Sequence, residues 1–203
     1  MLIKRIISSI LLISFVAAVI FIDWIFGLAV ILFIARGLYE FFTMLEKKGI
    51  KIYKYVGIAI GIIIPLSIAF HFELTKNWEL LLIVLALIFL IVMQFRRRQN
   101  SGTIVDISTT IFGILYVSWF FSFLLKIRYL PAGIGLFISL LLITKLGDIG
   151  AYLIGSRFGK TPFMPRISPN KSVEGAVGGL FFSIAGAFIS KPFFPAFGGI
   201  PPW

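Results

Sequence analysis

The sequence lacks cysteine altogether and contains a single histidine, His71, among its 203 residues. The absence of cysteine excludes disulfides, thiolate metal sites and cysteine nucleophiles, and a single imidazole nearly excludes a histidine-based metal site. Charged residues make up only 13%, against about a quarter in soluble globular proteins. The rest is strongly apolar, with 60% hydrophobic residues, 23 Phe and a mean hydropathy of +1.07. The chain is therefore predicted to be a polytopic membrane protein.

Seven apolar segments are each long enough to cross a bilayer, which takes about 20 residues per helix. They are residues 6–22, 24–44, 53–72, 78–95, 106–125, 131–155 and 175–190. The sequence therefore predicts an all-α fold, a polytopic transmembrane helical bundle of about seven spans. The first segment resembles a signal peptide, but no small-residue cleavage site follows it, so we expect it to remain as the first span.

Basic residues outnumber acidic ones by nineteen to eight, which gives a net charge of +11. If the N-terminus is cytoplasmic, thirteen of them fall in inner loops, four in outer loops and two within spans. This asymmetry follows the positive-inside rule and predicts that orientation. We attribute the basic excess to topology and to anionic headgroups, and expect no nucleic-acid partner. The expected location is the cell inner membrane, or another membrane that faces the cytoplasm, crossed several times.

Four ionisable residues within the predicted spans are candidates for function: Arg36, Glu40, Lys145 and Asp148. A charge at the centre of a membrane helix costs at least about 2.5 to 3.5 kcal/mol, so each of these residues is a candidate for a functional role. Arg36 and Glu40 lie four positions apart, and Lys145 and Asp148 three, so each pair can form an ion pair on one helix face. We interpret the first pair as structural and Asp148 as functional.

Small residues surround Asp148 in "GDIGAYLIG", and Tyr152 lies one helical turn further on. Small residues allow a ligand or a second helix to approach the backbone closely. Hard cations such as Mg²⁺ take oxygen ligands, and the chain offers no thiolate. The segment therefore predicts that Asp148 holds a divalent cation near the cytoplasmic interface.

The loop over about 156 to 174 gathers the remaining polar residues. "GSRFGKT" is not a P-loop, because only three residues separate its glycines and Pro162 follows directly. In "ISPNKSVEG", Ser168 before Pro169 has the form of a helix N-cap, and Ser172 offers a second one. A helix N-terminus beside Lys171 would bind phosphate. The alternative is that these residues only begin a membrane helix, with Lys171 extending to the interface and Glu174 complementing the dipole.

The segment "GDIGAYLIGSRFGKTPFMPRISPNKSVEG" resembles the phosphatidate cytidylyltransferases, also called CDP-diacylglycerol synthases. Members carry D-x-x-A-Y-x-x-G-x-x-F-G-K and, after a short loop containing proline, S-P-K-K-T-x-E-G. The first motif matches at Asp148, Ala151, Tyr152, Gly155, Phe158, Gly159 and Lys160, and the second at Ser168, Pro169, Lys171, Glu174 and Gly175. Asn170 replaces a frequently basic position, and Ser172 keeps the hydroxyl of the family's Thr. Weaker similarity surrounds Glu40 in "ARGLYEF".

This resemblance implies that CTP reacts with phosphatidic acid to give CDP-diacylglycerol and pyrophosphate, with Mg²⁺ as cofactor, in phospholipid biosynthesis. The residues it implies in catalysis are Asp148, which would also be the metal ligand, Lys171, and Glu174, which would orient Lys171 or the metal. The residues it implies in substrate binding are Ser168, Lys160, Tyr152, Asn170 and Ser172. The lipid bilayer is the third expected partner, beside CTP and phosphatidic acid.

The family's C-terminal signature, a K-D pair followed by H-G-G and a D-R-x-D run, does not occur in the sequence. No His follows residue 71 and no Asp follows Asp148. We therefore expect residues 1–203 to form a single integral membrane domain, with N-terminal spans over 6–95 and a partial catalytic region over 106–190, that lacks a C-terminal catalytic segment and is inactive alone. A second copy of the chain or a complementing C-terminal segment is the expected protein partner. The alternative function is a membrane transporter with an intramembrane charged path.

Overall fold

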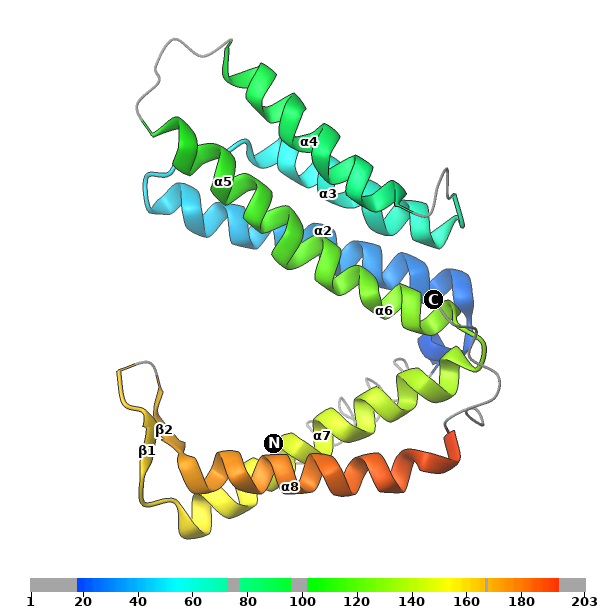
Figure 1. Cartoon of the computed structure of the whole chain (residues 1–203), viewed down its shortest axis with the longest axis vertical. Coiled ribbons are helices and arrows are strands. Elements are labelled where there is room, and N and C mark those ends of the chain that lie inside the picture. Colours follow the sequence, from blue (N-terminus) through cyan, green and yellow to red (C-terminus); the bar gives the residue numbers. More distant parts are fainter. Residues whose placement is uncertain (1–17, 73–76, 96–101, 167, 194–203) are drawn as a thin grey trace, which may run out of the picture. The chain divides into compact units, whose positions relative to one another are not determined.

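The computed structural model describes residues 18–72, 77–95, 102–166 and 168–193 (Figure 1). The chain divides into two compact units, Met1–Lys126 and Ile127–Trp203, and each is described by itself. The described residues are mostly helical, as the sequence predicts, although one short β-hairpin interrupts the helices of the second unit. The single-domain organisation stays a prediction.

Four helical segments that begin at or after Asp23 make up most of the described part of the first unit. They are α2 (Asp23–Lys47), α3 (Lys54–Ala69), α4 (Trp78–Gln94) and a continuous helix made of α5 (Thr103–Gly113), a π-helical turn (Ile114–Trp119) and α6 (Phe120–Tyr129), which ends just beyond the unit boundary. Asp23 in the first turn of α2 and Lys47 in its last turn stabilise this helix, because both charges complement the helix dipole.

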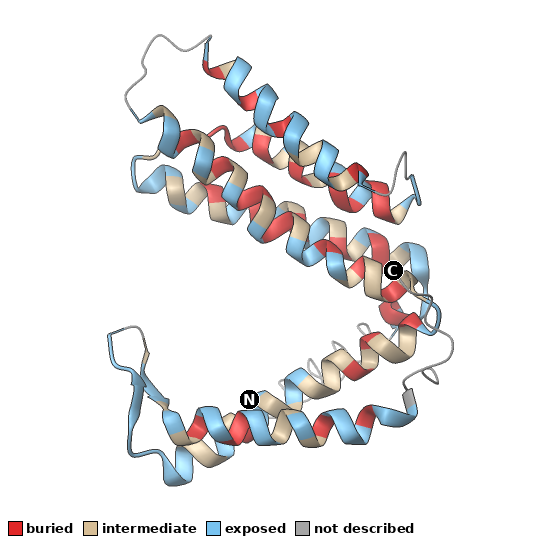
Figure 2. Cartoon of the chain, viewed as in Figure 1, coloured by how far each residue is buried: buried red, intermediate tan, exposed pale blue. Residues whose placement is uncertain are grey.

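The core of the first unit follows one face of α2. Its largest buried side chains recur at every fourth position, namely Phe26, Val30, Ile34, Leu38 and Phe42. Glycines of the neighbouring helices let the backbones approach this face: a Cβ atom placed on Gly57 would lie 2.8 Å from the Phe42 ring, and one on Gly61 would lie 2.5 Å from Leu38. Small residues at helix contacts are typical of membrane bundles. Figure 2 shows the buried stripe along these helices.

The second unit is a helical hairpin closed by a β-hairpin. Helix α7 (Gly133–Phe158) leads into strands β1 (Pro162–Met164) and β2 (Ser168–Ser172), and α8 (Val173–Ser190) returns antiparallel to α7 (Figure 1). A short 3₁₀ turn follows (Lys191–Phe193). The two strands pair antiparallel. The hairpin lies in the loop that the sequence predicted to be polar and non-helical.

Glycines form the contact between α7 and α8. A Cβ atom on Gly150 would lie 2.4 Å from Phe182, and one on Gly178 would lie 2.5 Å from Ile154. Both distances are too short for a real Cβ contact, so any larger side chain at these positions would separate the helices. The "GDIGAYLIG" segment therefore serves close packing against α8 as well as the surroundings of Asp148.

Four helices of the described residues are long and apolar enough to cross a membrane: Asp23–Lys47, Thr103–Tyr129, Gly133–Phe158 and Val173–Ser190. They correspond to four of the seven predicted segments. The helices α3 and α4 match two more, but they have 16 and 17 residues and are shorter than a typical span. The segment 6–22 lies almost entirely outside the described residues. A membrane protein is supported, whereas the count of seven and the N-terminal orientation stay predictions.

Candidate functional site

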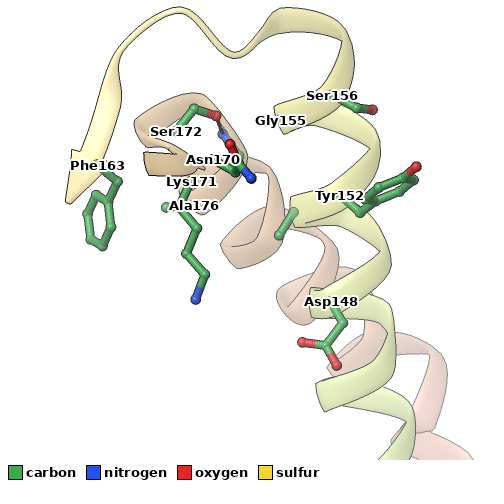
Figure 3. A pocket seen from close by; sticks show the side chains of 11 residues that line it. Asp148, Tyr152, Gly155, Ser156, Phe163, Asn170, Lys171, Ser172 and Ala176 are labelled. Carbon is green, nitrogen blue, oxygen red and sulfur yellow. Dashed lines mark hydrogen bonds between the residues drawn. The ribbon is translucent and has the colours of Figure 1, made fainter. Parts of the chain in front are cut away.

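A pocket of about 550 Å³ lies in the second unit, between the last turns of α7, the β-hairpin and the first turn of α8 (Figure 3). Its lining residues come from all of these elements: Asp148, Ala151, Tyr152, Gly155, Ser156, Phe163, Asn170, Lys171, Ser172, Gly175 and Ala176. Five of the eight predicted site residues are among them. The structure therefore brings together Asp148 and Tyr152 from α7 with Asn170, Lys171 and Ser172 from β2.

Asp148 contributes the pocket's one carboxylate, from the second half of α7. The predicted pair with Lys145 forms, at 3.5 Å between Nζ and Oδ2, but the two side chains are 73% and 75% exposed. An exposed pair of this kind is worth little, so it leaves the carboxylate accessible to a ligand. In Figure 3 the carboxylate is turned to the side on which Lys171 lies, whereas the Tyr152 ring points away from it.

Asn170 and Lys171 reach the pocket from strand β2, whose pairing with β1 has an irregular register. Pro162 pairs with Ser172 and Met164 pairs with Ser168, so the three residues of β1 face the five residues of β2. Pro169 has no N–H to donate to the ladder, which explains why the extra residues bulge here. Bulges of this kind redirect side chains and are common beside active sites. Within the described residues, the Lys171 ammonium has neither a hydrogen bond nor an ion pair, so it remains available to an anion.

The two predicted N-caps have different outcomes. Ser172 caps α8, because its Oγ accepts a hydrogen bond from the Gly175 N–H at 3.1 Å. Ser168 is not an N-cap, and that prediction is wrong: Ser168 and Pro169 belong to strand β2. The helix begins four residues later than the Ser-Pro pattern indicates, because pairing with β1 holds this segment extended.

Glu174, in the first turn of α8, binds the loop that follows α7. Its carboxylate accepts hydrogen bonds from the N–H groups of Lys160 and Thr161, each at 3.2 Å, and from the Thr161 hydroxyl at 2.9 Å. No hydrogen bond joins it to Lys171 among the described residues. The sequence therefore located Glu174 at the site, but the structure connects it to Lys160 and Thr161.

Three predicted site residues lie outside the pocket lining: Ser168, Lys160 and Glu174. Ser168 is at the far end of β2, opposite Met164, and Lys160 supplies its backbone N–H to Glu174. Thr161 was missed by the sequence analysis, and so was Phe163, which lines the pocket. The only signal for Thr161 was its position after the "FGK" motif, since a single Thr in a polar loop indicates no particular partner.

Arg36 and Glu40, in the first unit, form the predicted ion pair at 2.8 Å between Nε and Oε1. Both side chains are exposed, and the pair lies on one face of α2 at the spacing of a helical turn. The structural interpretation of this pair is consistent with its geometry. Of the second predicted pair, Lys145 with Asp148, only Asp148 lines the pocket.

Comparison with known proteins gives one family and one recurring name. A model of the Cytidylyltransferase family matches residues 3–201. The chain is 32% identical over 132 residues to the phosphatidate cytidylyltransferase of Mycobacterium leprae (strain TN), which covers 60% of the chain and 41% of that protein. It is 27% identical over 176 residues to the phosphatidate cytidylyltransferase of Staphylococcus aureus (strain COL), which covers 84% of the chain and 66% of that protein. Neither name supports the transporter alternative.

Each of these matches covers a larger share of this chain than of the relative. The chain spans 41% of the Mycobacterium leprae protein and 29% of the phosphatidate cytidylyltransferase of Mycobacterium tuberculosis (strain ATCC 25618 / H37Rv), to which it is 36% identical over 98 residues. The chain therefore matches less than half of each mycobacterial relative.

Proposed function

The chain belongs to the Cytidylyltransferase family, and from this we propose that the protein containing it transfers a cytidylyl group from CTP to phosphatidic acid in phospholipid biosynthesis. The products would be CDP-diacylglycerol and pyrophosphate. The observation that carries the proposal is the pocket that receives the Asp148 carboxylate and the Lys171 ammonium group from separate elements. The names of the relatives support the same reaction.

The proposed reaction is a substitution at phosphorus. A phosphate oxygen of phosphatidic acid forms a bond to the α-phosphorus of CTP, and the bond between that phosphorus and the bridging oxygen to the β-phosphate breaks. Pyrophosphate leaves with the electron pair of the broken bond. Negative charge accumulates on the phosphate oxygens, so the protein's contribution is to position the reactants and to neutralise this charge. Lys171 is the pocket residue suited to that task.

Family members generally depend on a divalent metal ion, and we propose Mg²⁺ for this protein. The described residues contain no group of three His, Cys, Asp or Glu side chains that could hold a metal by themselves. Asp148 alone fits the mode in which Mg²⁺ binds one or two carboxylates together with substrate phosphates and water. In that mode the metal would supply charge neutralisation at the triphosphate, and Asp148 would hold it at the pocket.

The other proposed residues assist in binding. Asn170, Ser172 and Tyr152 line the same pocket and offer an amide, a hydroxyl and a phenol to the nucleotide or to the lipid headgroup. Ser168 and Lys160 are proposed as contacts for the triphosphate outside the pocket lining. Phosphatidic acid would enter from the bilayer with its headgroup at the cytoplasmic face of the inner membrane, or of another membrane facing the cytoplasm. A second copy of the chain or a complementing C-terminal segment is proposed as a protein partner.

The test is the formation of CDP-diacylglycerol from radiolabelled CTP and phosphatidic acid with Mg²⁺, by the protein containing this chain. Asp148→Asn and Lys171→Ala should each lower turnover at least about a hundredfold, because the first removes the proposed metal ligand and the second removes the positive charge that neutralises the phosphates. Asp23→Asn and Lys191→Ala are the matched controls, since neither residue is among those that line the pocket, and both variants should retain turnover. Normal turnover in both pocket variants would contradict the site assignment.

A further inference from the structure

We propose that Thr161 and Glu174 form a positioning clamp that holds the base of the β-hairpin and thereby sets Lys171 for the triphosphate of CTP. This inference rests on the proposed function. It gives Glu174 a role different from orienting Lys171 or a metal directly, and it adds Thr161, which carries no role in the sequence analysis. Neither residue touches the reacting groups in this proposal, so both are positioning residues.

Thr161 contacts the start of α8 with all three of its polar groups. Its N–H and its hydroxyl donate to the Glu174 carboxylate, and its carbonyl accepts a hydrogen bond from the Val173 N–H at 2.9 Å. The Lys160 N–H adds a further bond to the second carboxylate oxygen. Hydrogen bonds to a carboxylate are roughly twice as strong as neutral ones. The turn after α7 is therefore attached to the first turn of α8.

These contacts lie directly beside the first rung of the hairpin. Thr161 precedes Pro162 and Val173 follows Ser172, and Pro162 and Ser172 are themselves paired. Ser172 is fixed a second time by its bond to the Gly175 N–H. Lys171 is the next residue along β2, so its backbone position follows from the residues that the clamp holds.

The hairpin needs such support because its own pairing is weak. Strand β1 has three residues, β2 contains a proline, and the register shifts between the two paired positions. A two-stranded hairpin is marginally stable in water even when it is regular. The exposed arm of the hairpin contributes little that would fix Lys171, so the hydrogen bonds at its base are the main restraint on the position of Lys171.

Both oxygens of the Glu174 carboxylate already accept hydrogen bonds from the turn that follows α7. One oxygen accepts from the N–H and hydroxyl of Thr161, and the other accepts from the N–H groups of Lys160 and Thr161. A carboxylate with these partners also complements the positive end of the α8 dipole. This geometry gives Thr161, which follows "FGK", and Glu174, in the first turn of α8, a common task.

The kinetic test compares Thr161→Val, which removes the hydroxyl at nearly constant shape, with Thr161→Ser, which keeps it. We expect Thr161→Val and Glu174→Gln to raise KM for CTP about tenfold, the scale of one lost charge-assisted hydrogen bond. KM for phosphatidic acid should stay within about twofold of its value in the unaltered protein. Thr161→Ser should leave KM for CTP at the value of the unaltered protein. Thr144→Val is the matched control, because the Thr144 hydroxyl bonds only to its own helix.

A second readout does not depend on activity. Trypsin can cut the hairpin region after Lys160, Arg166 and Lys171, and release of the hairpin should speed cleavage there in Thr161→Val and Glu174→Gln but not in Thr161→Ser or Thr144→Val. Unchanged cleavage in both clamp variants would overturn the clamp. Faster cleavage with an unchanged KM for CTP would overturn its positioning role. If the unaltered protein forms no CDP-diacylglycerol while cleavage responds as expected, the proposed function fails and the clamp stands as the restraint on the hairpin.

Discussion

Asp148 and Lys171 reach one pocket from two different elements, α7 and β2. The Asp148 carboxylate has only a long, exposed contact to Lys145, and Lys171 has no partner among the described residues. Two opposite charges that are not paired with each other suit a ligand that carries both phosphate and a bound cation. These two side chains are therefore the residues on which the proposed chemistry depends most directly.

Lys145 provides a prediction at this scale. Because its pair with Asp148 is exposed and measures 3.5 Å, the pair should contribute no more than about 0.2 to 1 kcal/mol. We expect Lys145→Met to change turnover in the CDP-diacylglycerol assay by less than about fivefold, which is the equivalent of that energy. A loss as large as that of Asp148→Asn would mean that Lys145 itself acts on the substrate.

The sequence predicted the pocket residues that lie on regular structure or at a cap. Asp148 was found as an ionisable residue within a predicted span, Tyr152 from its position one helical turn further on, and Ser172 from its capping pattern. Ser168 was misassigned because the Ser-Pro pattern is local, whereas its conformation depends on pairing with Met164. Thr161 was not found, since its importance comes from a partner thirteen residues away.

At the scale of elements, the α7–α8 pair depends on glycines facing inwards while large side chains face outwards. Phe181 and Phe188 on α8 are 69% and 74% exposed, whereas Gly178, on the same helix, is buried against Ile154. The glycines make room for Ile154 and Phe182 of the facing helix, and this close approach is typical of membrane helix pairs. This arrangement places the bulky apolar groups where lipid or other helices can contact them.

Gly178 tests this packing. Gly178→Leu should destabilise the protein by at least about 1 to 3 kcal/mol, the usual cost of overpacking, because its Cβ alone would lie 2.5 Å from Ile154. The measurement is the thermal unfolding midpoint in detergent. Ala187→Leu is the matched control on the exposed side of α8 and should leave the midpoint unchanged. Equal stability of the two variants would show that the α7–α8 contact is not close in the folded protein.

The helices could largely be predicted from the sequence, and the hairpin could not. Long apolar runs bounded by charges and glycines locate α2, α7 and α8 to within a few residues. The strands have three and five residues and contain Pro162 and Pro169, so neither shows the alternation that identifies a strand. Their pairing depends on the two helices bringing the ends of the loop together.

At the scale of the whole molecule, the distribution of basic residues predicts which loops face the cytoplasm. The absence of cysteine makes this prediction directly testable, because a single introduced cysteine is the only thiol in the chain. We expect an impermeant maleimide to label Asn77→Cys and Pro131→Cys in intact cells, and Lys48→Cys and Arg166→Cys only after the membrane is opened. Labelling of Arg166→Cys from outside would reverse the orientation and place the pocket on the wrong side for CTP.

Strand β2 and helix α8 meet without a linker, since Ser172 ends the strand and also caps the helix. A change in the tilt of α8 must therefore move the end of β2, and Lys171 with it. The tilt of a membrane helix responds to the thickness of the bilayer. With α8 crossing the bilayer as the sequence predicts, the height of the Lys171 ammonium group above the hydrocarbon would depend on lipid chain length, so a thicker or thinner bilayer would raise or lower it relative to the phosphates.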